Sequence, residues 1–167
     1  SLCEMDMDAS YAIIEMGMSS KGEISKLVSY VTPDIALITN VYPMHIEFFD
    51  NFEEIAEAKA EIFEGLKQGG TAIINEDTNF ADILKLRAKE HNAKIILFGK
   101  NNHYEGELNL EQDGEIQRYN AWAALSVAQA LKLDLNKAAA ALKDFGALDG
   151  RGKHHNLKIH DGHYTLI

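Results

Sequence analysis

The sequence predicts an α/β fold, a three-layer sandwich in which helices cover both faces of a mostly parallel sheet. Two observations lead to this fold class. From Tyr11 to Lys100, short β-rich runs alternate with helical stretches, which is typical of parallel strands joined by helices. The β-rich runs are also continuously apolar, as strands buried on both faces are. They are residues 12–14, 35–38, 72–74 and 95–98.

The spacing of apolar residues predicts a helix after each of the first three strands. These helices cover residues 22–31, about 52–66 and about 80–91. Asp50 or Asn51 can cap the second helix, because both side chains accept hydrogen bonds from a helix N-terminus. The glycine pair at residues 69–70 stops the chain before the next strand.

Beyond residue 100 the pattern changes. Residues 101–117 are polar with weak alternation, and we expect a short hairpin or a surface connection there. Residues 119–131 and 135–145 are rich in alanine and leucine at helical spacing, which predicts a helical hairpin. The tail holds two β runs around Asp161-Gly162, a dipeptide that favours the turn of a C-terminal β-hairpin.

Charge and length limit the function. With 167 residues, the chain has the length of one domain. It carries 16 basic and 26 acidic side chains, for a formal net charge of −10 at pH 7. Because nucleic-acid binding needs concentrated lysine and arginine, this balance disfavours DNA and RNA as partners. An acidic protein that handles phosphates needs metal ions and a few placed cations, so Mg²⁺ is the expected ion.

Cysteine content and hydropathy indicate the compartment. The single cysteine, Cys3, excludes an internal disulfide and a multi-thiolate metal site, which suits a reducing compartment. No apolar run approaches the roughly 20 residues that span a bilayer. The first ten residues are acidic, unlike a signal peptide. We therefore expect a cytoplasmic protein without membrane insertion.

Polar side chains follow the first two predicted strands. Glu15 comes directly after residues 12–14, and Asn40 and His45 follow the next strand. Ligands of open parallel sheets bind at these carboxyl ends. A solvated carboxylate and a packed histidine are the ordinary alternatives. Together, Glu15 and His45 suit a divalent-cation site, with waters and substrate phosphates as further ligands.

Lys59 lies among four glutamates on the second predicted helix, at the edge of its apolar stripe. An ion pair on an exposed helix face is the ordinary interpretation of such a lysine. If the side chain instead faces the sheet, a free ammonium there is costly unless it is paired or modified. The spacing leaves both interpretations open.

Several separated stretches resemble the central domain of the Mur ligases, the ATP-dependent amide-forming enzymes of peptidoglycan synthesis. They occur in the family's order and cover most of residues 11–167. They are YAIIEMGMSSKGEI, ALITNVYPMHIEFFDNFEEIAEAKAEIFEGL, TAIINEDTN, YNAWAAL and LDGR. Within the family, E-M-G followed by G-E-I is most similar to the type that adds D-alanyl-D-alanine to UDP-N-acetylmuramoyl-tripeptide.

The resemblance implies a reaction and a metal site. ATP phosphorylates the terminal carboxylate of the peptide substrate, and an amine then attacks the acyl phosphate. Catalysis of this phosphoryl transfer rests on metal ions and positioning. Glu15 and His45 match Mg²⁺ ligands of the family. Lys59, in A-K-x-E-I, matches a lysine that reacts with CO₂ to form a carbamate that holds Mg²⁺.

The resemblance also implies nucleotide contacts. Asn120, in N-A-x-A-A, matches an adenine-side contact of ATP, and Arg151, in D-G-R, matches a phosphate-side contact. Asn75 and Asp77, which follow the third predicted strand, are further nucleotide-site residues on this interpretation.

The sequence also departs from the family pattern. The glycine-rich P-loop ending G-K-T or G-K-S does not occur. Ser19-Ser20 stand where the family has Asn-His, and residues 114–117 replace its G-x-H-N. We therefore expect residues 1–167 to be one domain, a truncated central domain without the N-terminal UDP-substrate and C-terminal amine-binding domains. Such a fragment would be inactive alone.

Two alternatives remain open. Other Mur ligases and folylpolyglutamate synthetases share the metal and lysine motifs, so the amide ligase could belong to another of these types. A non-catalytic nucleotide- or metal-binding module is the hypothesis from a different class.

Overall fold

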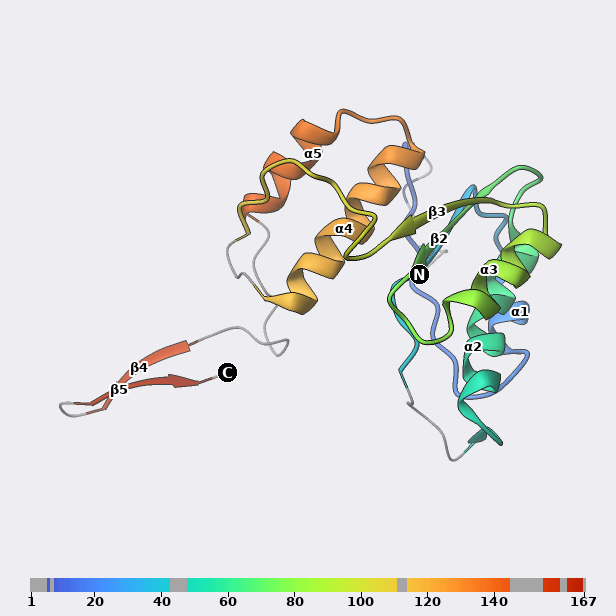
Figure 1. The fold of residues 1–167 in the computed structure, drawn as a ribbon, viewed down its shortest axis with the longest axis horizontal. Helices are drawn as coiled ribbons and strands as arrows, with labels where there is room; N and C mark the ends of the chain where they lie inside the picture. Colours follow the sequence, from blue (N-terminus) through green and yellow to red (C-terminus); the bar gives the residue numbers. More distant parts are fainter. Residues whose placement is uncertain are drawn as a thin grey trace.

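The computed structural model describes residues 6, 8–42, 48–110 and 114–144, and the backbone of residues 155–159 and 162–166. Its centre is a parallel sheet with the strand order β1-β2-β3. The strands are β1 Ile35–Ile38, β2 Thr71–Asn75 and β3 Lys94–Phe98. Helices lie on both sides of the sheet (Figure 1), which confirms the predicted three-layer α/β class.

The three strands send alternate side chains to the two helical layers. The register pairs Ala36 with Ala72 and Leu37 with Ile73. The core under α2 and α3 contains the strand residues Ala36, Ile38, Ala72, Ile74, Ile95 and Leu97. The core under α4 contains Ile35, Leu37, Ile73, Ile96 and Phe98. Because both faces are covered, residues 35–38, 72–74 and 95–98 of these strands are continuously apolar, as the sequence predicted.

One face of the sheet is covered by the first helical layer (Figure 1). It consists of α1 Glu23–Val28, α2 Phe52–Ala60, the 3₁₀ helix η3 Glu61–Gly65 and α3 Ala81–Glu90. The side chain of Asn51 accepts the backbone N–H of Glu54 at 2.9 Å, so Asn51 is the cap of α2. The predicted helix over residues 52–66 therefore starts as expected and ends as a 3₁₀ helix.

The opposite face is covered by α4 Glu115–Ala130, and α5 Leu135–Ala141 packs on α4, followed by the 3₁₀ turn η4 Leu142–Asp144. This confirms the helical hairpin, although α4 begins at Glu115 rather than at residue 119. Between β3 and α4, the described residues 99–110 contain no strand. That segment is a surface connection and not a hairpin.

The last two strands, β4 His155–Ile159 and β5 Gly162–Leu166, are antiparallel and form the predicted C-terminal hairpin. The register pairs Ile159 with Gly162, so Gly162 already belongs to the second strand. Within the described part of the chain, every helix is too short or too polar to cross a membrane.

The first expected strand is not formed. Residues 11–18 have no regular secondary structure, and Ile13 is 98% exposed. A strand needs a neighbour for its backbone hydrogen bonds, and no described strand pairs with this segment. The prediction for residues 12–14 was wrong because it rested on apolar composition alone. Glu15 consequently does not lie at the end of a strand.

Candidate functional site

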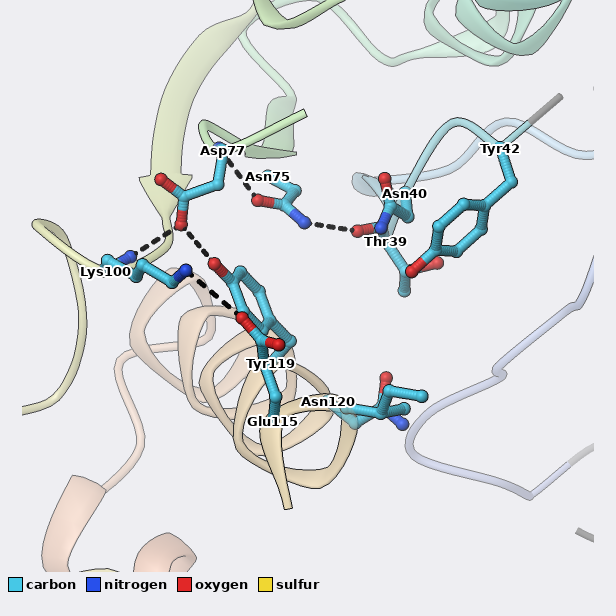
Figure 2. A pocket seen from close by; sticks show the side chains of 10 residues that line it. Thr39, Asn40, Tyr42, Asn75, Asp77, Lys100, Glu115, Tyr119 and Asn120 are labelled. Atoms are coloured by element: carbon cyan, nitrogen blue, oxygen red, sulfur yellow. Dashed lines mark hydrogen bonds and ion pairs between the residues drawn. The ribbon is translucent and has the colours of Figure 1, made fainter. Parts of the chain in front are cut away.

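A pocket of about 340 Å³ opens at the carboxyl edge of the sheet, where the strand ends face the first turns of α4 (Figure 2). The strand ends contribute Thr39, Asn40, Tyr42, Asn75, Asp77 and Lys100. Helix α4 contributes Glu115, Ile116, Tyr119 and Asn120. Ligands of open α/β sheets bind at this edge, so this pocket is the candidate site.

Asp77 joins three elements at one carboxylate oxygen. Its Oδ2 accepts the hydroxyl hydrogen of Tyr119 at 2.6 Å and the backbone N–H of Lys100 at 2.8 Å. Figure 2 shows both bonds converging on Asp77 from α4 and from the segment after β3. We call this arrangement the Asp77 junction. It fixes the width of the pocket between the sheet and α4.

The Asp77 junction shifts the pKa values of both side chains. Burial opposes ionisation of Asp77, but the hydrogen bonds from Tyr119 and Lys100 outweigh it and lower the pKa of this carboxyl. Burial raises the pKa of the Tyr119 hydroxyl, and the hydrogen bond to the Asp77 carboxylate raises it further. At neutral pH, Tyr119 therefore stays a protonated donor to an ionised acceptor.

Asn75 ties the ends of two strands together. Its side-chain Nδ2 donates to the backbone carbonyl of Thr39 at 3.0 Å, and its Oδ1 accepts the backbone N–H of Asp77 at 3.0 Å. The residue is only 2% exposed. The Asn75 amide thus fixes the end of β2 to the end of β1 at the rim of the pocket, and it also orients Asp77.

The junction also requires a glycine at position 99. A Cβ on Gly99 would lie 2.6 Å from Asp77 Oδ2 and 2.7 Å from Glu76 Cγ. The backbone φ there is +156°, which L side chains rarely adopt. Only glycine lets the segment after β3 approach the Asp77 carboxylate this closely.

The charges of the pocket are nearly balanced. The ammonium of Lys100 lies 3.1 Å from the Glu115 carboxylate, so this cation is already paired. With Asp77, the lining carries one more negative than positive charge. Aromatic and amide side chains, including Tyr42 and Asn120, supply most of the remaining surface. Such a pocket suits a neutral ring with hydrogen-bonding edges better than a phosphate group.

Some residues predicted from the sequence are brought together and others are not. Asn75, Asp77 and Asn120 line the same pocket. Glu15 is exposed on the segment of residues 11–18 and contacts no described residue through a hydrogen bond or ion pair. Lys59 lies on α2 and does not line the pocket. His45 and Arg151 lie outside the described residues.

Lys59 nevertheless has an unusual environment. Its side chain is half-buried, and burial lowers the pKa of its ammonium. No carboxylate among the described residues forms an ion pair with it, in contrast to Lys67, Lys85 and Arg87. The ion-pair interpretation of Lys59 therefore finds no support among those residues.

The structure adds pocket residues that the sequence did not indicate, namely Thr39, Tyr42, Lys100, Glu115, Ile116 and Tyr119. Of these, Tyr119 lies next to Asn120 in the sequence and Lys100 follows the strand that ends at Phe98. These positions were the signal in the sequence that could have pointed to them. Among the described residues, no group of three histidine, cysteine, aspartate or glutamate side chains could hold a metal ion.

The sequence and the fold match a known class of protein. A family model described as the Mur ligase middle domain matches residues 1–136. Because the match covers most of the chain, the chain belongs to this family. The resemblance drawn from the motifs is thereby confirmed.

Individual relatives are consistent with this assignment. A UDP-N-acetylmuramoyl-tripeptide–D-alanyl-D-alanine ligase of Rickettsia prowazekii is 33% identical over 95% of this chain and 40% of that protein. A crystal structure of MurF from Acinetobacter baumannii has a TM-score of 0.85 at 25% identity, over 98% of this chain and 40% of that one. MurF ligase from Thermotoga maritima, solved in complex with ADP, has a TM-score of 0.67 at 25% identity, over 82% of this chain and 36% of that one. The chain thus spans about 40% of the length of such relatives.

Proposed function

We propose that this chain is the nucleotide-binding middle domain of an ATP-dependent ligase that adds D-alanyl-D-alanine to UDP-N-acetylmuramoyl-tripeptide in peptidoglycan synthesis, in the cytoplasm. The observation that carries the proposal is the pocket at the carboxyl edge of the sheet, lined by Asp77, Tyr119 and Asn120. Its support is that curated relatives over nearly the whole chain bear this name, and that one similar structure contains ADP.

The proposed reaction has two steps, a phosphoryl transfer and then the formation of an amide bond. An oxygen of the tripeptide's terminal carboxylate attacks the γ-phosphorus of ATP, the bond to the β-phosphate oxygen breaks, and an acyl phosphate and ADP form. The free amine of D-alanyl-D-alanine then attacks the acyl carbon, phosphate leaves, and the amine loses a proton as the amide forms. Both steps depend chiefly on positioning and on neutralising charge.

In this chain, the pocket's part is to hold the base of the nucleotide. The exposed amide of Asn120 contacts no described residue through a hydrogen bond, so it is available to a base edge. Tyr42 and Tyr119 offer aromatic surface, and the Asp77 junction keeps Tyr119 in place. Because the Lys100 ammonium is paired with Glu115, it is not free to bind phosphate. We therefore expect groups outside this pocket to bind the phosphates of the nucleotide.

We further propose a Mg²⁺ site made of Glu15, His45 and carbamylated Lys59. The described donors have suitable chemistry, because the Glu15 carboxylate is exposed and the lowered pKa of Lys59 favours the neutral amine that reacts with CO₂. When bound, the ion would neutralise charge on the transferring phosphoryl group.

Nucleotide binding is tested by titrating the ¹⁵N-labelled chain with ADP, adenosine and inorganic phosphate. We expect ADP and adenosine to shift the amide signals of Asp77, Tyr119 and Asn120, and phosphate to leave them unchanged. Shifts that are confined to other parts of the chain would contradict the assignment of this pocket.

Ligation is tested in a chimera in which this chain replaces the matching part of the Rickettsia prowazekii relative. We expect phosphate release that requires ATP, the UDP-linked tripeptide and D-alanyl-D-alanine together. A folded chimera that binds ADP but releases no phosphate would favour the non-catalytic module instead.

The Lys59 carbamate is tested in the same chimera. Lys59→Ala should abolish ligation while the protein stays folded, and Lys59→Arg should be equally damaging because guanidinium forms no carbamate. In ¹³CO₂-equilibrated buffer, a carbamate signal should be present in the wild type and missing in both variants. A fully active Lys59→Ala protein would rule out this role.

A further inference from the structure

Glu61 is a buried carboxylate that the nucleotide pocket does not use. It is 7% exposed and lies at the start of η3, directly after the last residue of α2. Its Oε1 accepts the backbone N–H of Gly22 at 2.7 Å, and its Oε2 accepts the backbone N–H of Ser25 at 3.0 Å. Both oxygens of one side chain are thus committed to the start of α1.

This contact replaces a local helix cap. The N-cap residue of α1 is Gly22, with φ +87° and no side chain to accept a hydrogen bond. Glu61 supplies the missing acceptor from 39 residues further along the chain. A carboxylate at a helix N-terminus is favourable, and hydrogen bonds to a charged acceptor are among the stronger ones.

The contact joins two parts of the chain, and each part carries one of the proposed metal ligands. On one side, Lys59 precedes Glu61 by two residues. On the other side, Gly22 ends the segment that begins at Glu15. That segment is also bonded to α1 itself, since the carboxylate of Glu23 accepts the backbone N–H of Ser19 at 2.7 Å.

We infer that Glu61 is a positioning residue: its carboxylate holds the Glu15-bearing segment and α1 against the helix that carries Lys59. The inference rests on the proposed function for the importance of Glu15 and Lys59. We call the attachment of α1 to Glu61 the hold, and the evidence for it is the two hydrogen bonds and the burial of Glu61. Glu61→Gln should weaken this contact, because the amide keeps one neutral acceptor oxygen and its NH₂ cannot accept the other backbone N–H.

The experiment compares Glu61→Gln with Glu64→Gln in the full chain. Glu64 is the matched control, since it lies on the same 3₁₀ helix, is exposed, and among the described residues accepts only the side-chain hydroxyl of Ser25. The first readout is amide hydrogen exchange. We expect Glu61→Gln to speed exchange by tenfold or more at Gly22, at Ser25 or at both, while amides of β2 and α3 stay unchanged. Glu64→Gln should change none of them by more than about twofold.

The second readout is the affinity for Mn²⁺ in bicarbonate buffer, measured from water-proton relaxation at a temperature where every variant is folded. Loss of a group that orients metal ligands costs about 10–100-fold in affinity, so we expect at least a tenfold weaker affinity in Glu61→Gln only. A residue that merely stabilised the fold would not change this affinity in folded protein.

The outcomes separate the two proposals. Unchanged exchange at Gly22 and Ser25 in folded Glu61→Gln overturns the hold, and faster exchange with unchanged Mn²⁺ affinity overturns the positioning role. If the wild type binds no Mn²⁺, the metal site of the proposed function fails, and the exchange data still decide the hold. If Glu61→Gln does not fold, Glu61→Asp replaces it, because the shorter carboxylate cannot reach both N–H groups. Unchanged exchange in Glu61→Asp overturns the hold in the same way.

Discussion

Residues 11–14 and strand β1, Ile35–Ile38, are both short apolar runs, yet only β1 belongs to the sheet. In β1, each residue pairs with one of β2, and Ala36 and Ile38 are buried. In the other run, Ile13 is 98% exposed and Tyr11 is exposed too. Because both runs are apolar, their composition does not explain this difference; what differs is whether neighbouring elements pair with the run and cover its side chains.

This comparison shows what an apolar run needs to become a strand. Its side chains must be covered, and its backbone N–H and C=O groups must also find partners. β1 has both, since β2 supplies the hydrogen bonds and the helices cover the faces. Residues 11–14 have neither among the described residues. The first two predictions below use this contrast, and the third tests the Asp77 junction.

The largest expected effect comes from truncating one isoleucine of the sheet, in the strand that pairs with β1, and one isoleucine of residues 11–14. Ile74→Ala should lower the free energy of unfolding by about 2–5 kcal/mol, because Ile74 is fully buried between β2 and the first helical layer. Ile13→Ala should change it by less than about 0.5 kcal/mol. Urea unfolding followed by circular dichroism measures both. Equal losses in the two variants would mean that residues 11–14 are packed in solution.

A smaller effect is expected from adding one methyl group. A Cβ on Gly65 would lie 2.3 Å from Val28 Cγ2, and Val28 is buried where α1 packs on η3. Gly65→Ala should therefore cost about 1–3 kcal/mol and speed hydrogen exchange in α1. Gly17→Ala is the control, because no atom lies within 4 Å of its added Cβ. A destabilised Gly17→Ala protein would show that the exposed segment has contacts in solution.

The smallest effect concerns pH and the Asp77 junction. The pKa of Asp77 is lower in the folded chain than the value of about 3.9 expected when unfolded. Its contribution to stability is therefore complete above that unfolded value and is lost as the pH falls through the lowered folded pKa. The contribution is small, since Asp77 is exposed enough for solvent to screen it.

The junction can be followed through Trp122, the single tryptophan, whose ring lies 5.1 Å from that of Tyr119. Between pH 5 and pH 2, its emission should change in the wild type and change less in Tyr119→Phe. Identical pH profiles in the two proteins would contradict the role of the hydroxyl.

Local sequence patterns predicted most of the sheet and helices. Residues 35–38, 72–74 and 95–98 are strands because their apolar side chains fit a sheet that is buried on both faces. The cap of α2 was predicted as Asp50 or Asn51 and is Asn51, and such a prediction is possible because a cap depends on residues within one turn. The failure at residues 12–14 arose because strand formation also depends on a distant partner.

The same distinction applies to the site. Asp77 and Asn120 were predicted as site residues, because one follows a strand end and the other lies in a family motif. The bond between Asp77 and Tyr119 was not predicted, since it depends on how α4 is rotated about its axis. The contacts of Glu61 likewise join residues more than thirty positions apart, and no local pattern signals such a pairing.

The alternation of side chains in β2 also limits how this domain can change in length. Ile73 fills the core under α4, and Ile74 fills the core under α2 and α3. Inserting or deleting one residue within β2 would exchange these directions for every later position of the strand. Asn75 would then turn away from Thr39, and the rim of the pocket would lose its tie to β1. Length variation among related sequences should therefore fall in the surface segment after β3 and be missing from β2.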